Sequence, residues 1–113
     1  MKNTDGEYIV INGRMLDKLP KEFVDRYFWK DTYSEKQFRK FIEDSQDFFE
    51  RYQRGEDCTG YMIGNANALH VWEDRCVTVG KSKTGYGFAT NGRHRIYVAR
   101  KYKLNILVCV GNF

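Results

Sequence analysis

The chain has 113 residues, of which 42% are hydrophobic and 16% aromatic, with a single proline and a formal net charge of +4. This composition predicts one folded domain over residues 1–113 and argues against a linker or a low-complexity segment. No apolar run approaches eighteen residues and the N-terminus lacks a signal-peptide core, so we expect no membrane partner and a cytoplasmic location.

The first half of the chain predicts one short strand and two helices. Residues 7–11 are β-rich and end at the turn dipeptide Asn12-Gly13. A helix is expected over residues 21–30, with Pro20 at its first turn, and a longer helix over residues 35–54. The longer helix starts with the capping box formed by Ser34 and Gln37 and has aromatic residues at helical spacing, which predicts an amphipathic scaffold helix.

The pattern changes after residue 56 to short β-rich segments. We expect strands over residues 61–63, 68–72 and 75–79, followed by a polar loop at residues 80–85. The three cysteines, Cys58, Cys76 and Cys109, have no metal-binding spacing and are expected to be reduced, so no metal site is predicted from them.

The last third predicts strand, turn, helix and strand, over residues 86–89, 90–92, 93–103 and 106–110. This order is typical of a βαβ unit, whose two strands run parallel with a right-handed crossover. The expected fold is therefore α+β or α/β: a small mixed sheet, one long amphipathic helix and a C-terminal βαβ unit.

Charge is distributed unevenly along the chain. Residues 1–74 contain all fifteen acidic and eleven basic residues, whereas residues 75–113 contain eight basic residues and no acidic one, a net charge of +8. A basic segment of this kind favours an anionic partner.

The turn before the last helix lies inside this basic segment. Backbone N–H groups at a helix N-terminus attract anions, and arginine suits bidentate contact with phosphate. The predicted phosphate-binding residues are Thr90, Asn91, Gly92, Arg93 and Arg95, with Lys83 on the preceding loop as a lid. Trp72, Tyr86 and Tyr97 could stack on a base.

Catalysis would need an acid, a base or a metal in addition. His94 is the best acid–base candidate because imidazole titrates near neutral pH. The two histidines, His94 and His70, with a lysine or arginine would be enough for metal-free RNA cleavage, and Glu73 with Asp74 would serve metal-dependent chemistry instead. Neither arrangement has a diagnostic spacing. The predicted catalytic residues are His94, Arg95, His70 and Glu73.

The segment Asn91-Gly92-Arg93-His94-Arg95, with Ala99 four residues later, resembles the (D/E)GxHRxxAA signature of the ParB/sulfiredoxin-like superfamily. Asn91 stands where many members have an acidic residue. The resemblance covers about the last thirty residues and implies a small α/β domain whose motif holds nucleotide or nucleic-acid phosphate. It also implies a nucleotide cofactor, ATP or CTP with Mg²⁺, in some members.

The leading hypothesis is a small nuclease acting on nucleic acid, which could be the toxin domain of a bacterial effector. Such a domain would act in a target cytoplasm and would need an acidic immunity protein as a partner. The alternatives are a nucleotide-binding regulatory or DNA-binding module without cleavage, a kinase-like enzyme that uses ATP or ADP, and a protein-interaction domain. Sulfiredoxin activity itself is not expected, because the turn contains no cysteine.

Overall fold

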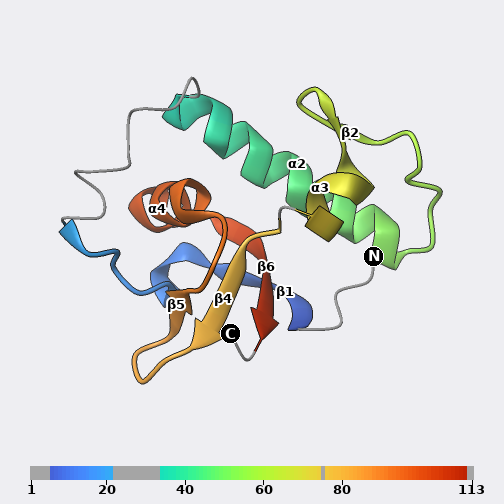
Figure 1. Ribbon diagram of the computed structural model, residues 1–113. Helices are drawn as coiled ribbons and strands as arrows, with labels where there is room; N and C mark the ends of the chain where they lie inside the picture. Colours follow the sequence, from blue (N-terminus) through green and yellow to red (C-terminus); the bar gives the residue numbers. More distant parts are fainter. Residues whose placement is uncertain (1–5, 22–33, 75, 112–113) are drawn as a thin grey trace.

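The structure is a computed structural model, and it describes residues 6–21, 34–74 and 76–111 (Figure 1). Its elements in chain order are β1 (Gly6–Asn12), η1 (Gly13–Met15), α2 (Glu35–Gln53), β2 (Met62–Ile63), β3 (Ala66–Asn67), α3 (Ala68–Asp74), β4 (Thr78–Lys81), β5 (Tyr86–Phe88), α4 (Arg93–Tyr102) and β6 (Asn105–Gly111). The helix expected over residues 21–30 lies outside the described residues apart from Lys21.

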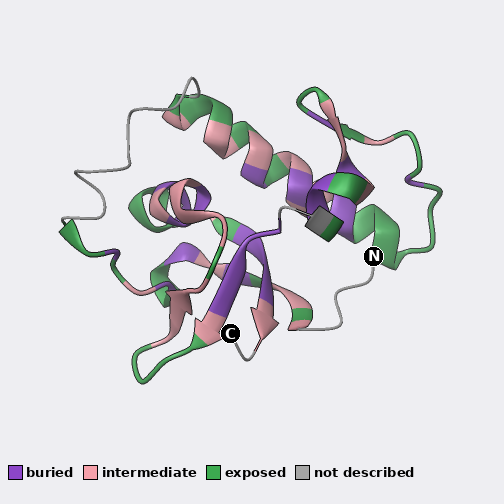
Figure 2. Cartoon of the chain, viewed as in Figure 1, coloured by how far each residue is buried: buried purple, intermediate pink, exposed green. Residues whose placement is uncertain are grey.

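Four strands form a mixed sheet in the order β1-β6-β4-β5, which confirms the small mixed sheet expected from the sequence. β6 pairs antiparallel with β1 and parallel with β4, and β5 pairs antiparallel with β4. The four residues from Ile106 to Cys109 are buried, so β6 is an interior, near-continuously apolar strand of the sheet (Figure 2). Cys109, like Cys58 and Cys76, is a buried cysteine outside any disulfide.

The predicted βαβ unit is wrong in its topology. The strands on either side of α4 are β5 and β6, and β4 lies between them in the sheet. Because β5 is antiparallel to β4 while β6 is parallel to it, β5 and β6 run in opposite directions. The reason is the loop at residues 82–85, which reverses the chain so that β5 folds back on β4 as a hairpin. α4 then carries the chain to the other side of β4, and the parallel pair is β4 with β6.

The long helix α2 confirms the strongest local prediction. The Ser34 backbone N–H donates to Gln37 Oε1 at 2.8 Å, and the Gln37 backbone N–H donates to Ser34 Oγ at 3.2 Å, so the capping box is complete. α2 packs on β6 and on α4 through one apolar side that includes Ile42, Phe48 and Phe49. No helix among the described residues is both long enough and apolar enough to cross a membrane.

Residues 68–72 form the start of helix α3 and not a strand. Ala68, Val71 and Trp72 are buried and stand at positions i, i+3 and i+4, which is a helical face. The Asn67 side chain accepts a hydrogen bond from the Leu69 N–H at 3.0 Å and so caps the first turn. A short apolar run fits both the two-residue period of a strand and the 3.6-residue period of a helix. In this segment the helix is formed, and it positions three apolar residues in the core.

Candidate phosphate-binding surface

The turn at residues 90–92 is built around the side chain of Thr78. Its hydroxyl oxygen accepts hydrogen bonds from the backbone N–H groups of Thr90, at 3.0 Å, and Asn91, at 2.9 Å. The same oxygen lies 2.9 Å from Thr90 Oγ1, and the Thr78 N–H donates to the Asn91 carbonyl at 3.0 Å. The backbone N–H groups of Thr90 and Asn91 therefore already have a partner inside the protein.

Gly92 is the N-cap of α4 and has a left-handed backbone with φ of 95°. A Cβ atom at this position would lie 2.9 Å from Val77 Cγ2 and 3.0 Å from Val77 Cα. Glycine is therefore needed both for the backbone conformation and for close packing against the residue that precedes Thr78. Its carbonyl accepts the first hydrogen bond of the helix, from the Ile96 N–H at 2.9 Å.

Arg95 lies in the interior, although the sequence predicts it as a phosphate ligand. Only 8% of the residue is exposed, and its guanidinium carbon lies 5.0 Å from the ring centre of Phe41 and 5.9 Å from that of Trp72. Burial lowers the pKa of Arg95 to about 10. Because this pKa is still well above 7, the side chain stays charged at neutral pH. Its closest described aromatic neighbours come from α2 and α3, which gives Arg95 a role in joining these helices to α4.

The other candidates for catalysis are distributed over two helices. His94 is half-buried and its ring stacks on Phe38 of α2, with ring centres 5.3 Å apart and an angle of 7° between the rings. His70 and Glu73 are exposed on α3. The two histidines thus have different surroundings, and His94 is the one at the predicted turn.

Lys83 is at the exposed tip of the β4–β5 hairpin. Val79 pairs with Phe88 and Lys81 with Tyr86, so the tip is at the opposite end of the hairpin from Thr78 and Thr90. The structure therefore does not bring Lys83 to the turn as the lid that the sequence predicts.

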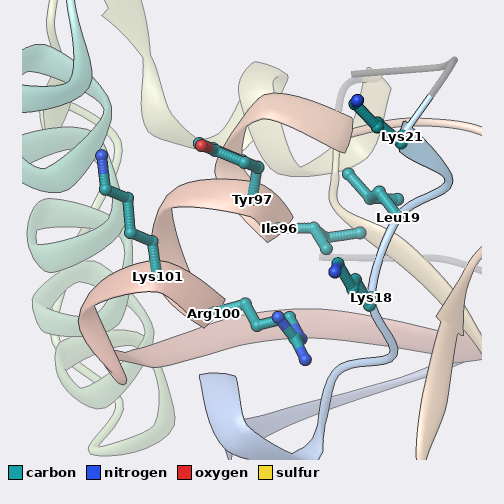
Figure 3. A pocket seen from close by; sticks show the side chains of 7 residues that line it. All are labelled: Lys18, Leu19, Lys21, Ile96, Tyr97, Arg100 and Lys101. Carbon is teal, nitrogen blue, oxygen red and sulfur yellow. The ribbon is translucent and has the colours of Figure 1, made fainter. Parts of the chain in front are cut away.

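A pocket on α4 was not predicted. It has a volume of about 340 Å³ and lies between α4 and the segment after η1 (Figure 3). Four of its lining residues are basic and none of those described is acidic; the lining residues are Lys18, Leu19, Lys21, Ile96, Tyr97, Arg100 and Lys101. The pocket is thus a concave site with an apolar interior and a cationic margin.

Two hydrogen bonds hold in place the segment after η1, which forms one side of the pocket. The Asp17 N–H donates to the Tyr86 carbonyl at 2.8 Å, which fixes the segment along β5. Arg100 Nε donates to the Leu16 carbonyl at 3.2 Å, which ties α4 to the same segment. Because one nitrogen of the Arg100 guanidinium is used in this contact, the direction of the side chain is set before any ligand arrives.

Two carboxylates stand next to the pocket cations. Lys101 Nζ donates to Glu35 Oε1 at 2.9 Å, and the Tyr102 hydroxyl also donates to Glu35. These hydrogen bonds, that from Tyr102 first, lower the pKa of Glu35. Asp17 accepts a hydrogen bond from Thr84 Oγ1 at 2.7 Å, and the pKa of Asp17 is lowered by hydrogen bonds from Ser82 and Thr84 and, to a smaller extent, by the charge of Arg100.

The pocket and the predicted turn belong to the same helix. Arg93, Tyr97 and Lys101 are four residues apart in succession, which aligns them along one side of α4 from its first turn to its last. In the sequence, the basic segment and the four-residue spacing of these side chains indicate the part of the site that lies on α4. Lys18 and Lys21 gave no such signal, because their position beside α4 depends on the pairing of Asp17 with β5.

No protein-family model, curated protein or solved structure matches this chain. The resemblance to the ParB/sulfiredoxin-like superfamily therefore stays a prediction from the motif. The described residues contain no group of three or more His, Cys, Asp or Glu side chains that could hold a metal ion.

Proposed function

We propose that this domain binds the phosphates of nucleic acid or nucleotide along α4. The binding surface comprises six residues and is called the α4 basic surface below: Lys18, Lys21, Arg93, Tyr97, Arg100 and Lys101. The observation that carries the proposal is the gathering of four cationic side chains, from two distant parts of the chain, around one pocket without an acidic residue among its described lining residues.

The chemistry of these side chains suits a phosphodiester ligand. Lysine and arginine neutralise phosphates and release counterions, which supplies most of the affinity of sequence-independent binding. Arg100 is positioned in advance by its contact with the Leu16 carbonyl, so less side-chain freedom is lost on binding. Tyr97, which is half-buried, also lines the pocket and adds an aromatic side chain to this surface.

Binding is a better supported proposal than cleavage. A metal-free nuclease needs an acid, a base and a cation converging on one phosphate. Arg95 is buried, His94 is stacked on Phe38, and His70 is exposed on a different helix. The nuclease and kinase hypotheses, and a cofactor such as ATP or CTP with Mg²⁺, stay predictions from the motif.

The proposal is tested by fluorescence anisotropy with a labelled twelve-nucleotide single strand of RNA or DNA. The Lys18→Ala/Lys21→Ala variant should bind more weakly than the wild type. It should also lower the slope of log K against log salt concentration by about 1.4, because each phosphate that a protein neutralises on a single strand adds roughly 0.7 to this slope.

The matched control is Lys36→Ala/Lys40→Ala, which removes two exposed lysines at similar spacing from α2. It should leave both affinity and slope nearly unchanged. If both double variants weaken binding equally, the effect comes from the net charge of the protein, which would contradict binding at a defined site. The same oligonucleotides, incubated with and without Mg²⁺ and resolved on a gel, report directly on cleavage.

A further inference from the structure

We propose that the pocket on α4 binds a small organic carboxylate, with its apolar body on Leu19 and Ile96 and its carboxylate between Lys18 and Arg100. This inference goes beyond phosphate binding, because a ligand with an apolar body and a single negative charge differs from a nucleic-acid backbone. It rests on the pocket alone and does not need the proposed function.

The interior of the pocket is apolar. Leu19 and Ile96 line it, and only 8% and 1% of their surfaces are exposed, so this wall is part of the packed core. The methylene stems of Lys18 and Lys21 add apolar surface, since a lysine side chain keeps only its amine in water. An apolar group against these walls leaves water, which is favourable, whereas a phosphate group alone gains nothing from them. The interior therefore favours a ligand with an apolar body.

Two of the four cations are positioned to hold an anion at one side of this interior. Figure 3 shows the Lys18 amine and the Arg100 guanidinium on the same side of the pocket. The amines of Lys21 and Lys101 point away from them, and Lys101 donates to Glu35 at 2.9 Å. The hydrogen bond to the Leu16 carbonyl uses only Nε of Arg100, and the two terminal nitrogens suit bidentate contact with a carboxylate.

The charge around these two cations favours a ligand with one negative charge. Asp17 interacts with Arg100: hydrogen bonds from Ser82 and Thr84 lower the pKa of Asp17, and the charge of Arg100 lowers it to a smaller extent. At neutral pH, Lys18 and Arg100 are positive and Asp17 is negative, which leaves a single positive charge. A carboxylate neutralises this charge, whereas a phosphate monoester, with about 1.5–2 negative charges at pH 7, exceeds it.

The size of the pocket limits the body of the ligand. A volume of about 340 Å³ is near the lower end of the range for small-molecule sites, roughly 300–1,000 Å³. The pocket therefore suits a compact aliphatic or aromatic acid, and not a large cofactor.

The test is a ¹H–¹⁵N NMR titration of the protein alone at pH 7 with hexanoate, acetate, 1-hexanol and hexyl phosphate. Hexanoate should shift the amides of residues 18–19 and 96–100. It should bind at least about tenfold more tightly than acetate, since each buried methylene group contributes a factor of roughly four. It should also bind about tenfold more tightly than 1-hexanol, which lacks the charge. Hexyl phosphate should bind no more tightly than hexanoate.

The exposed residue Lys18 offers a variant that tests the carboxylate contact without altering the core. Lys18→Met keeps an apolar side chain of similar length and should weaken hexanoate binding by up to about fivefold, as expected for an exposed ion pair. Lys36→Met, which removes an exposed lysine from α2, is the matched control and should bind hexanoate as the wild type does.

Acetate or 1-hexanol binding as tightly as hexanoate would overturn the inference, as would equal effects of the two variants or shifts only at other residues. Tighter binding of hexyl phosphate would also overturn it and would identify the pocket as a phosphate site. The oligonucleotide assay separates the two proposals: oligonucleotide binding without hexanoate binding removes only this inference, and hexanoate binding without oligonucleotide binding removes only the proposed function.

Discussion

At the scale of single residues, Thr78 has the largest structural role at the turn. One buried hydroxyl accepts two backbone N–H groups, contacts Thr90 Oγ1, and so fixes the path of the chain into α4. The turn is pre-formed by the protein itself, which leaves Arg93 and the following residues of α4 in a defined position for a ligand.

Thr78→Val should therefore destabilise the domain, because valine has the same shape but cannot accept the two N–H groups. We expect the free energy of unfolding to fall by about 1–3 kcal/mol, measured by urea denaturation. Thr59→Val removes an exposed hydroxyl that bonds Asp57 and should change stability by about 0.5 kcal/mol or less. A Thr78→Val protein as stable as the wild type would contradict the role assigned to this hydroxyl.

Arg95 shows where reasoning from residues alone reaches its limit. Its place in the motif and in a basic segment predicts a phosphate ligand, yet its side chain points between Phe41 and Trp72. Which side of a helix faces the core depends on the elements packed around it, and α2 and α3 are separate elements earlier in the chain. Substituting Arg95 would thus alter packing along with any ligand contact.

At the scale of elements, α2 and α4 are linked at the edge of the pocket by Glu35. The carboxylate of this first residue of α2 accepts hydrogen bonds from Lys101 and Tyr102 in the last turn of α4. The link connects the stability of the helix pair to the charge of the α4 basic surface, since the same lysine lines the pocket.

Glu35→Gln should strengthen oligonucleotide binding and slightly weaken the fold. The variant releases Lys101 and removes a negative charge next to the ligand, while the partly exposed ion pair is worth no more than about 1 kcal/mol. Glu43→Gln, on an exposed site of the same helix, is the matched control for net charge and should bind as the wild type does.

The stability part of this prediction depends on pH. The pKa of Glu35 is lowered in the folded state, so its contribution is complete above the ordinary value of 4.5 and is lost as the pH falls through the folded value. The difference in unfolding free energy between wild type and Glu35→Gln, measured by urea denaturation, should therefore shrink below pH 4.5. A difference that stays constant in acid would rule out the carboxylate as its source.

The elements themselves differ in how far the sequence predicts them. α2 has local signals at its start, along its apolar side and at Gly55, and its structure agrees closely with the prediction. α3 is seven residues long, too short for periodicity to separate helix from strand. The parallel pairing predicted for residues 86–89 with residues 106–110 was wrong, because strand pairing is decided between distant residues and the polar loop before β5 does not indicate which strand β5 will pair with.

At the scale of the whole molecule, the proposed site joins two distant parts of the chain. α4 belongs to residues 75–113, which contain eight basic and no acidic residues. Lys18 and Lys21 belong to residues 1–74, in which acidic residues outnumber basic ones. The sequence thus predicted the helix that carries most of the proposed site, and anion binding by this region stays a prediction. It did not predict the pocket, which exists because Asp17 pairs with Tyr86 at the edge of the sheet and brings Lys18 and Lys21 against α4.

The most direct measurement is a ¹H–¹⁵N NMR titration of the wild type with the twelve-nucleotide single strand, following every backbone amide. Binding at the α4 basic surface predicts that the largest shifts occur at residues 18–21 and 96–101, with smaller changes at residue 93. Shifts confined to residues 90–92, to the hairpin tip at residues 82–85 or to α3 would place the ligand elsewhere. That result, or the absence of any shift, would contradict the account.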